Sequence, residues 1–215
     1  MRRWFSDSGA SVARFASALA AFCLLLSSPA WADSAALTQV LQQKPTLEGF
    51  DMCYGGGCAA MARITLSAEE WQRVVQVFTP TPENAAAERV AISHALGEME
   101  QMVGAKTGTS VDKAGTFGVW GKPGQLDCND EAANSTAYMK LMLKEGLIRF
   151  HDILDTKRRG FFLNGWPHTT AAILDRASGE RFAVDSWFYD NGQPAVIVPL
   201  EQWKSGWKPG NSPAR

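Results

Sequence analysis

The chain has 215 residues, and its 21 lysines and arginines against 22 aspartates and glutamates give a formal net charge of −1 at pH 7. Proteins that bind nucleic acids or anionic membrane surfaces concentrate positive charge on one face or in one segment. No basic cluster of that kind occurs in this sequence, so neither partner is expected.

The segment 1–32 has the organisation of a secretory signal peptide. Arginines near the start are followed by an apolar run from Phe15 to Leu26, and Ala30-Trp31-Ala32 places small residues where a signal peptidase cleaves. The pair Arg2-Arg3 leaves twin-arginine export open beside the ordinary Sec route. We therefore expect residues 1–32 to be removed and the mature protein to be periplasmic or secreted.

The remaining 183 residues suit a single domain, because a chain of this length buries roughly 70% of the surface that it exposes when unfolded. We expect that domain to cover residues 33–203. Residues 204–215 are polar and rich in glycine and proline, which predicts a flexible tail. No segment after residue 32 approaches the ~20 continuous apolar residues of a membrane helix, so no membrane contact is expected after signal cleavage. The sequence does not indicate the oligomeric state.

Three cysteines follow the signal segment, which is an odd number. Cys53 and Cys58 flank a short glycine-rich stretch, and in an oxidising compartment this pair is expected to form a disulfide. The three histidines of the chain show no metal-ligand spacing, so neither a metal nor another cofactor is expected. Cys128 is then left as a free thiol in an exported protein.

Most of the expected helices lie in the first part of the mature chain. Apolar residues recur there at helical spacing between capping and breaking residues. Ser67 and Glu70 form a capping-box pattern, and Gly146 is expected as the C-cap of the last long helix. The polar loop 104–124 is long enough to indicate function or mobility. The expected helices cover residues 35–43, 67–78, 83–103 and 128–145.

Short strands dominate the last part of the chain. They are rich in β-branched and aromatic residues and are separated by polar turns. One strand is expected at 62–66, and the others at 147–154, 160–164, 168–175, 181–188 and 194–200. Helices followed by strands predict an α+β fold with a mostly antiparallel sheet.

Cys128 is the candidate nucleophile, because it stands in the first turn of an expected helix. Unpaired backbone amides and the helix dipole favour a negative group at that position. The thiolate is the reactive form of cysteine, so we expect this position to lower the pKa of the thiol.

His168 and Asp185 lie on two strands that are expected to form a hairpin. An even-numbered loop such as Arg176 to Gly179 sets Asp185 opposite Thr170, diagonal to His168 on the same face of the sheet. An odd-numbered loop puts the two side chains on opposite faces, and the sequence leaves this register open. With the even loop, Asp185 would orient the imidazole while His168 takes the proton of the thiol.

Three short segments carry a resemblance to a known superfamily. They are Asp127-Cys128-Asn129-Asp130, Pro167-His168-Thr169-Thr170 and Val184-Asp185-Ser186-Trp187. Their order and spacing over residues 125–187 resemble the transglutaminase-like and papain-like cysteine peptidase superfamily, most of all the bacterial transglutaminase-like cysteine proteinases. The resemblance implies a core with the nucleophile at a helix N-terminus, a Cys-His-Asp triad, and a tryptophan that covers the hydrogen bond between His168 and the acid.

The chain also departs from that pattern. Asn129 and Asp130 follow the cysteine, where papain-like enzymes have a small residue and then an aromatic one. Thr169 follows the histidine, where transglutaminases usually have tryptophan. These departures affect the expected substrate class more than the expected nucleophile.

Further candidates surround the expected triad. Gln125, three residues before Cys128, could donate to an oxyanion together with the amide of Cys128, or it could be an ordinary polar loop residue. His151 competes with His168 as the base, but no acid follows His151 at hairpin spacing. Tryptophans could wall a cleft, although most tryptophans of a sheet belong to the core. The candidates are Trp120, Trp166 and Trp187.

These features predict a thiol acyl-transfer enzyme that acts on a peptide or protein substrate. Hydrolysis of peptide or amide bonds is favoured over transfer to an amine, because water is always present in an exported setting. The alternative is a non-catalytic periplasmic binding or assembly module, since the same fold can serve recognition without chemistry.

Overall fold

The computed structural model describes Met1 and residues 35–119, 121–160 and 167–210. The expected signal peptide, the cleft candidates Trp120 and Trp166, and most of the strand expected at 160–164 lie outside the described residues. Within the described ranges, no helix combines the length and the apolar character needed to cross a bilayer.

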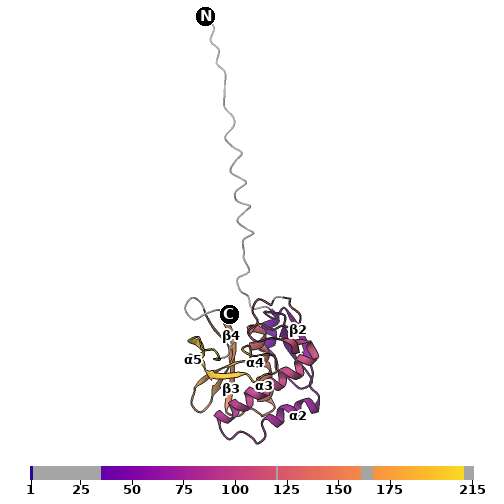
Figure 1. Cartoon of the computed structure of the whole chain (residues 1–215), viewed down its shortest axis with the longest axis vertical. Coiled ribbons are helices and arrows are strands. Elements are labelled where there is room, and N and C mark those ends of the chain that lie inside the picture. Colours follow the sequence, from indigo (N-terminus) through magenta and orange to yellow (C-terminus); the bar gives the residue numbers. More distant parts are fainter. Residues whose placement is uncertain (2–34, 120, 161–166, 211–215) are drawn as a thin grey trace. The chain divides into compact units, whose positions relative to one another are not determined.

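Helices and antiparallel sheets make up the described chain, which confirms the α+β class (Figure 1). The first part contains α1 (Ala35–Gln42), β1 (Phe50–Tyr54), β2 (Ala60–Ile64), α2 (Ala68–Val77), α3 (Ala85–Thr107) and the 3-10 turn η1 (Thr109–Val111). The second part contains α4 (Cys128–Lys144), β3 (His151–Arg159), β4 (His168–Asp175), β5 (Arg181–Asp185), β6 (Val196–Pro199) and α5 (Leu200–Lys204).

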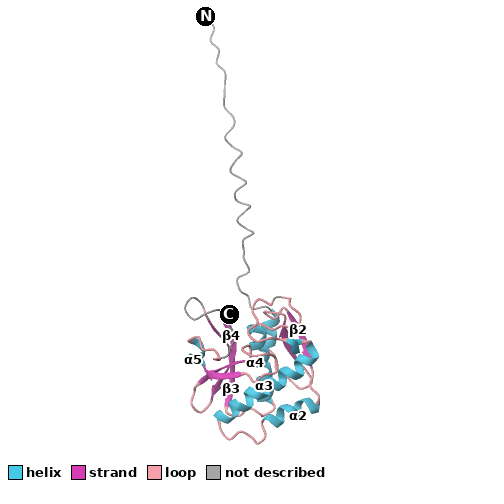
Figure 2. Ribbon diagram, viewed as in Figure 1, coloured by secondary structure: helices cyan, strands magenta, loops and turns pink. Residues whose placement is uncertain are grey.

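The strands form two separate antiparallel sheets. β1 pairs with β2, and the four later strands form a sheet in the order β3-β4-β5-β6. Helix α4 packs against β1 of the first sheet and against β3, β4 and β5 of the second. In Figure 2 the strands β3 and β4 are seen on one side of α4, and β2 and α2 on the other. The helix that begins at Cys128 is therefore the central element of the domain.

Local capping explains where the helices begin and end. Ser67 and Glu70 form the expected capping box of α2. The expected end of α3 at Val103 is wrong, because the helix continues through Gly104 and stops at Gly108, whose φ of 79° ends it. A Cβ atom on Gly104 would lie 3.0 Å from the backbone nitrogen of Ser110, so this glycine permits η1 to pack closely against α3.

Several expected strand boundaries are corrected by tertiary contacts. β1 has no counterpart among the expected strands, and its buried Phe50 and Met52 face the core. β3 begins at His151 rather than Leu147 and runs on to Arg159. The backbone amides of Arg149 and Phe150 donate to Glu88 at 2.6 and 2.9 Å instead of joining the sheet.

The β4–β5 hairpin has the even-numbered loop. Ala171 pairs with Val184, and the amide of Asp175 donates to the carbonyl of Glu180 at 2.9 Å, so residues 176–179 form the turn. This register confirms the arrangement that sets His168 and Asp185 on one face. β5 ends at Asp185, earlier than the expected Phe188, because the following residues turn away from the sheet.

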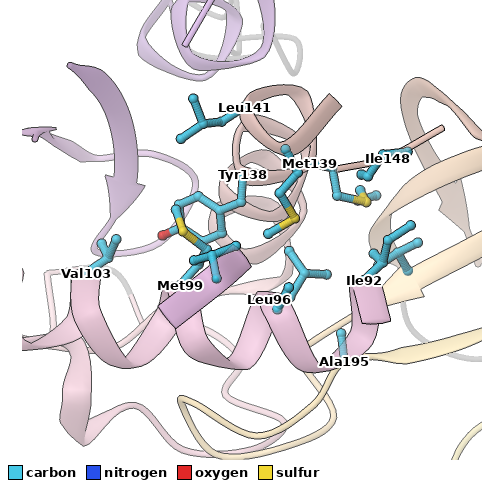
Figure 3. Close-up of a cluster of buried hydrophobic side chains, with 14 of the residues drawn as sticks. Ile92, Leu96, Met99, Val103, Tyr138, Met139, Leu141, Ile148 and Ala195 are labelled. Atoms are coloured by element: carbon cyan, nitrogen blue, oxygen red, sulfur yellow. The ribbon is translucent and has the colours of Figure 1, made fainter. Parts of the chain in front are cut away.

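The main core lies between α3 and α4. Figure 3 shows Ile92, Leu96 and Met99 of α3 reaching toward Tyr138 and Met139 of α4. These five side chains are buried. Because α4 is buried along most of its length, the position of its first residue is held by the core of the domain.

The C-terminal segment, expected to be flexible from residue 204, is held by contacts beyond Lys204. Trp203 of α5 is completely buried, and the ring of Trp207 lies 6.0 Å from that of Phe188. The Arg159 side chain donates to the carbonyl oxygens of both tryptophans. Aromatic packing therefore holds the chain against the sheet at least as far as Trp207.

Candidate active site

The start of α4 is fixed by two acidic side chains. Asp127 is the N-cap, and its Oδ1 accepts the amides of Asn129 and Asp130 at 2.9 and 3.0 Å. The carboxylate of Asp130 accepts the amides of Gly56 and Cys58 at 2.7 and 2.6 Å. The loop between the two cysteines is thereby anchored to the first turn of the helix that carries the candidate nucleophile.

Cys53 and Cys58 form the expected disulfide. The bond encloses the loop whose amides bind Asp130, so it limits the conformations of the segment beside the helix start. Burial, followed by the nearby charge of Asp127, raises the pKa of Asp130 to about 7.

Cys128 is a free cysteine that is only 5% exposed. Burial, followed by the charge of Asp127, raises the pKa of its thiol to about 12, while the backbone amide of Thr169 acts in the opposite direction. The expected lowering of this pKa is therefore wrong. The amides of the first turn already bind the carboxylate of Asp127, which offsets the helix dipole, and the thiol lies in an apolar cluster with Trp187 and Phe188.

His168 and Asp185 form the hydrogen bond that the hairpin predicts. Nε2 of His168 lies 2.7 Å from Oδ2 of Asp185, and both side chains are buried. An ionised carboxylate only accepts hydrogen bonds, so Nε2 carries the proton of the neutral ring and Nδ1 keeps a lone pair. The imidazole is thus held in the tautomer in which Nδ1 can act as a base.

Aromatic residues bring the thiol and the imidazole into one cluster. Trp187 and Phe188 pack with Cys128, and their ring centroids lie 4.4 and 5.5 Å from the ring of His168. The charge of Asp185 also acts on the thiol. Among the hydrogen bonds of the described residues, none joins the sulfur of Cys128 to His168. The sulfur and the ring therefore share one apolar site without a standing hydrogen bond.

Trp203 is a member of the site that the sequence analysis missed. Its Nε1 donates to Oδ2 of Asp185 at 2.7 Å, and its ring centroid lies 5.5 Å from that of His168. The residue follows Asp185 by 18 positions and stands directly before the expected tail. No motif marks it, and only the return of the chain through β6 and α5 brings it to the acid.

The side-chain N–H donors of Gln125 are already engaged in hydrogen bonds to backbone carbonyl groups. Its Nε2 donates to the carbonyl oxygens of Val111 and Gly124 at 3.0 and 3.4 Å. In this conformation it could stabilise an oxyanion only after breaking those bonds. Asn129, which directly follows Cys128, also carries a side-chain amide. Its Oδ1 accepts a hydrogen bond from Thr169 Oγ1 at 2.9 Å.

His151 belongs to a separate buried cluster. Its Nδ1 lies 2.8 Å from Glu88, and its Nε2 lies 3.2 Å from Arg89. Glu88 comes from α3, so an acid does orient His151, although not one at hairpin spacing. Both side chains are fully buried, and Glu88 also accepts two backbone amides, which indicates a structural role.

The expected site residues thus have different positions. Cys128, His168, Asp185 and Trp187 come together, Gln125 is bound to the neighbouring loop, and Trp166 lies outside the described residues. In the described part of the chain, no group of three or more His, Cys, Asp or Glu side chains is arranged to hold a metal ion.

Comparison of the chain with known protein families, with curated proteins and with solved structures gives no match.

Proposed function

We propose that this protein is an exported thiol acyl-transfer enzyme with a papain-like or transglutaminase-like core, and that its reaction is hydrolysis of peptide or amide bonds. The observation that carries the proposal is the buried 2.7 Å hydrogen bond between His168 and Asp185, in one cluster with a cysteine at a helix N-terminus. Cys128 is the nucleophile, His168 the base, and Asp185 the group that orients the base.

The reaction proceeds in two halves. The sulfur of Cys128 attacks the carbonyl carbon of the substrate while its proton passes to Nδ1 of His168. The bond to the leaving amine breaks, the amine takes that proton from His168, and the acyl group remains on sulfur as a thioester. Water then attacks the thioester, gives its proton to His168, and releases the acid as the thiol is restored.

The raised pKa of the Cys128 thiol requires that the proton leave as the substrate reacts. The resting site therefore holds a neutral thiol, unlike a site whose cysteine is already ionised before substrate binds. We expect iodoacetamide at pH 7 to alkylate Cys128 at least about 100-fold more slowly than it alkylates a small free thiol. The rate is measured by mass spectrometry of the Cys128 peptide. Alkylation as fast as that of the small thiol would contradict a buried, neutral thiol.

The proposal is tested by trapping the acyl-enzyme. The mature protein is mixed with p-nitrophenyl acetate or an activated peptide ester, quenched in acid and digested. We expect one acyl group on the Cys128 peptide of the wild type and none on the corresponding peptide of Cys128→Ala, which preserves the disulfide. Failure of both esters to acylate Cys128 would argue against the enzyme.

One observation favours a second candidate, a binding or assembly module. Cys128 is nearly inaccessible and its thiol is neutral, which also suits a cysteine retained for packing. Cys128→Ala separates the two: a binding module keeps its biological activity, whereas an enzyme loses it. Export to the periplasm or beyond is part of the proposal in either case, and the Cys53–Cys58 disulfide supports it.

A further inference from the structure

Three buried carboxyl groups influence one another next to the candidate active site. Glu100 belongs to α3, Asp112 follows η1, and Glu131 belongs to α4, one turn after Cys128. Their exposed fractions are 5%, 3% and 4%. Acidic groups so deeply buried need hydrogen-bond donors or protons, because burial disfavours a charged carboxylate.

The cluster holds both chain segments that enter the site. Oε2 of Glu131 accepts the hydroxyl of Ser186 at 2.5 Å, and Ser186 directly follows Asp185. Oε2 of Glu100 accepts the amide of Gly192 at 2.9 Å. Asp112 Oδ1 accepts the amide of Leu126, just before the cap of α4, at 2.7 Å. The segments 126–131 and 185–192 are thus both bound to this cluster.

Burial of the three carboxyl groups favours their protonated forms. The charges of Glu100 and Asp112 act on Glu131, and Oε1 of Glu100 is buried without a hydrogen-bond partner among the described residues. A proton retained by the cluster supplies an O–H donor that three ionised carboxylates would lack. Burial is the main cause that raises the pKa of Glu100 to about 7, that of Asp112 to about 6, and that of Glu131 well above its usual value.

The other titratable groups that act on the cluster do not neutralise it. Asp130 and Tyr138 of α4 and Asp190 of the segment after β5 influence its members, and each of them is neutral or negative. Lys113 is paired with Asp190 at 2.7 Å. Loss of the retained proton therefore places uncompensated like charges between α3, α4 and the segment after β5.

We propose that Glu131 is a positioning residue that, through Ser186, couples the helix of Cys128 to the segment of Asp185, and that this coupling holds only while the Glu131–Glu100–Asp112 cluster retains its proton. Any effect of this coupling on catalysis rests on the proposed function. The coupling itself is a property of the fold, so it is measured without substrate.

The first measurement is thermal unfolding between pH 5 and pH 8. A folded-state pKa raised above the unfolded value means that the folded protein binds more protons, so stability is present at low pH and is lost as pH rises through about 7. We expect the Tm of the wild type to fall by about 5 °C or more. Glu131→Gln keeps an acceptor for Ser186 and cannot ionise, so its Tm falls by less than half as much. Glu145→Gln, at the exposed end of the same helix, follows the wild type.

The second measurement is amide hydrogen exchange in residues 186–192. We expect the wild type to exchange as slowly as Glu131→Gln at pH 5.5 and about fivefold faster than Glu131→Gln at pH 8.5. Ser186→Ala, which removes the link from the other side, exchanges faster than both at either pH. If Glu131→Gln shows the same pH dependence of Tm and the same exchange as the wild type, the proposal is overturned. Neither readout depends on acylation of Cys128, so failure of the proposed enzyme activity is a separate result.

Discussion

Replacing His168 by alanine is expected to lower the rate of Cys128 acylation by a p-nitrophenyl ester at least about 10³-fold. A thiol whose pKa is raised to about 12 has almost no thiolate at neutral pH, so it needs a base during attack. In the described site, Nδ1 of His168 is the ring nitrogen that Asp185 leaves unprotonated. The acylation rate is measured by release of p-nitrophenol and by the mass of the Cys128 peptide.

Two variants make this result specific. Asp185→Asn keeps the size of the side chain but no longer favours the proton on Nε2, so we expect a loss of about 10²–10⁴-fold. His94→Ala removes an exposed histidine of α3 and should acylate like the wild type. If His168→Ala acylates Cys128 at the wild-type rate, His168 is not the base.

Trp203 is expected to give the largest effect on stability. The side chain is completely buried and its indole N–H donates to the buried carboxylate of Asp185. Trp203→Ala removes a large core side chain and leaves that oxygen with one donor fewer, so we expect the free energy of unfolding to fall by about 3–5 kcal/mol. Trp203→Phe keeps most of the ring and loses the donor, which costs about 1–3 kcal/mol. Urea unfolding followed by circular dichroism measures both.

Trp71→Phe is the matched control for the lost indole N–H. Trp71 of α2 is only partly buried, and it makes no side-chain hydrogen bond among the described residues, so its replacement should cost less than about 1 kcal/mol. Equal losses for Trp203→Phe and Trp71→Phe would mean that the hydrogen bond to Asp185 adds nothing to stability.

The candidate triad could be predicted because its parts depend on short stretches of sequence. The even-numbered turn at residues 176–179 sets the register that joins His168 to Asp185. The start of α4 follows from Asp127 and Asp130, which form a capping box. The capping carboxylate was visible in the sequence, and its charge already argued against a lowered pKa for the adjacent thiol.

The rest of the site depends on residues far apart in the chain. The sequence left Gln125 open between an oxyanion donor and a polar loop residue, and its side chain binds the carbonyl of Val111, a loop contact that no spacing rule predicts. Trp203 reaches Asp185 only after the chain has passed through β6. The carboxyl cluster joins Glu100 to Glu131 across two helices, and neither residue stands in a recognisable motif.

By itself the sequence determined the elements whose causes lie within a few residues: the capping box of α2, the disulfide loop, the start of α4 and the turn between β4 and β5. Only the tertiary structure decided how far Cys128 is buried and which charges act on it. Caps and turns depend on local backbone geometry, whereas the pKa of a thiol depends on the solvent and charges that the whole fold places around it.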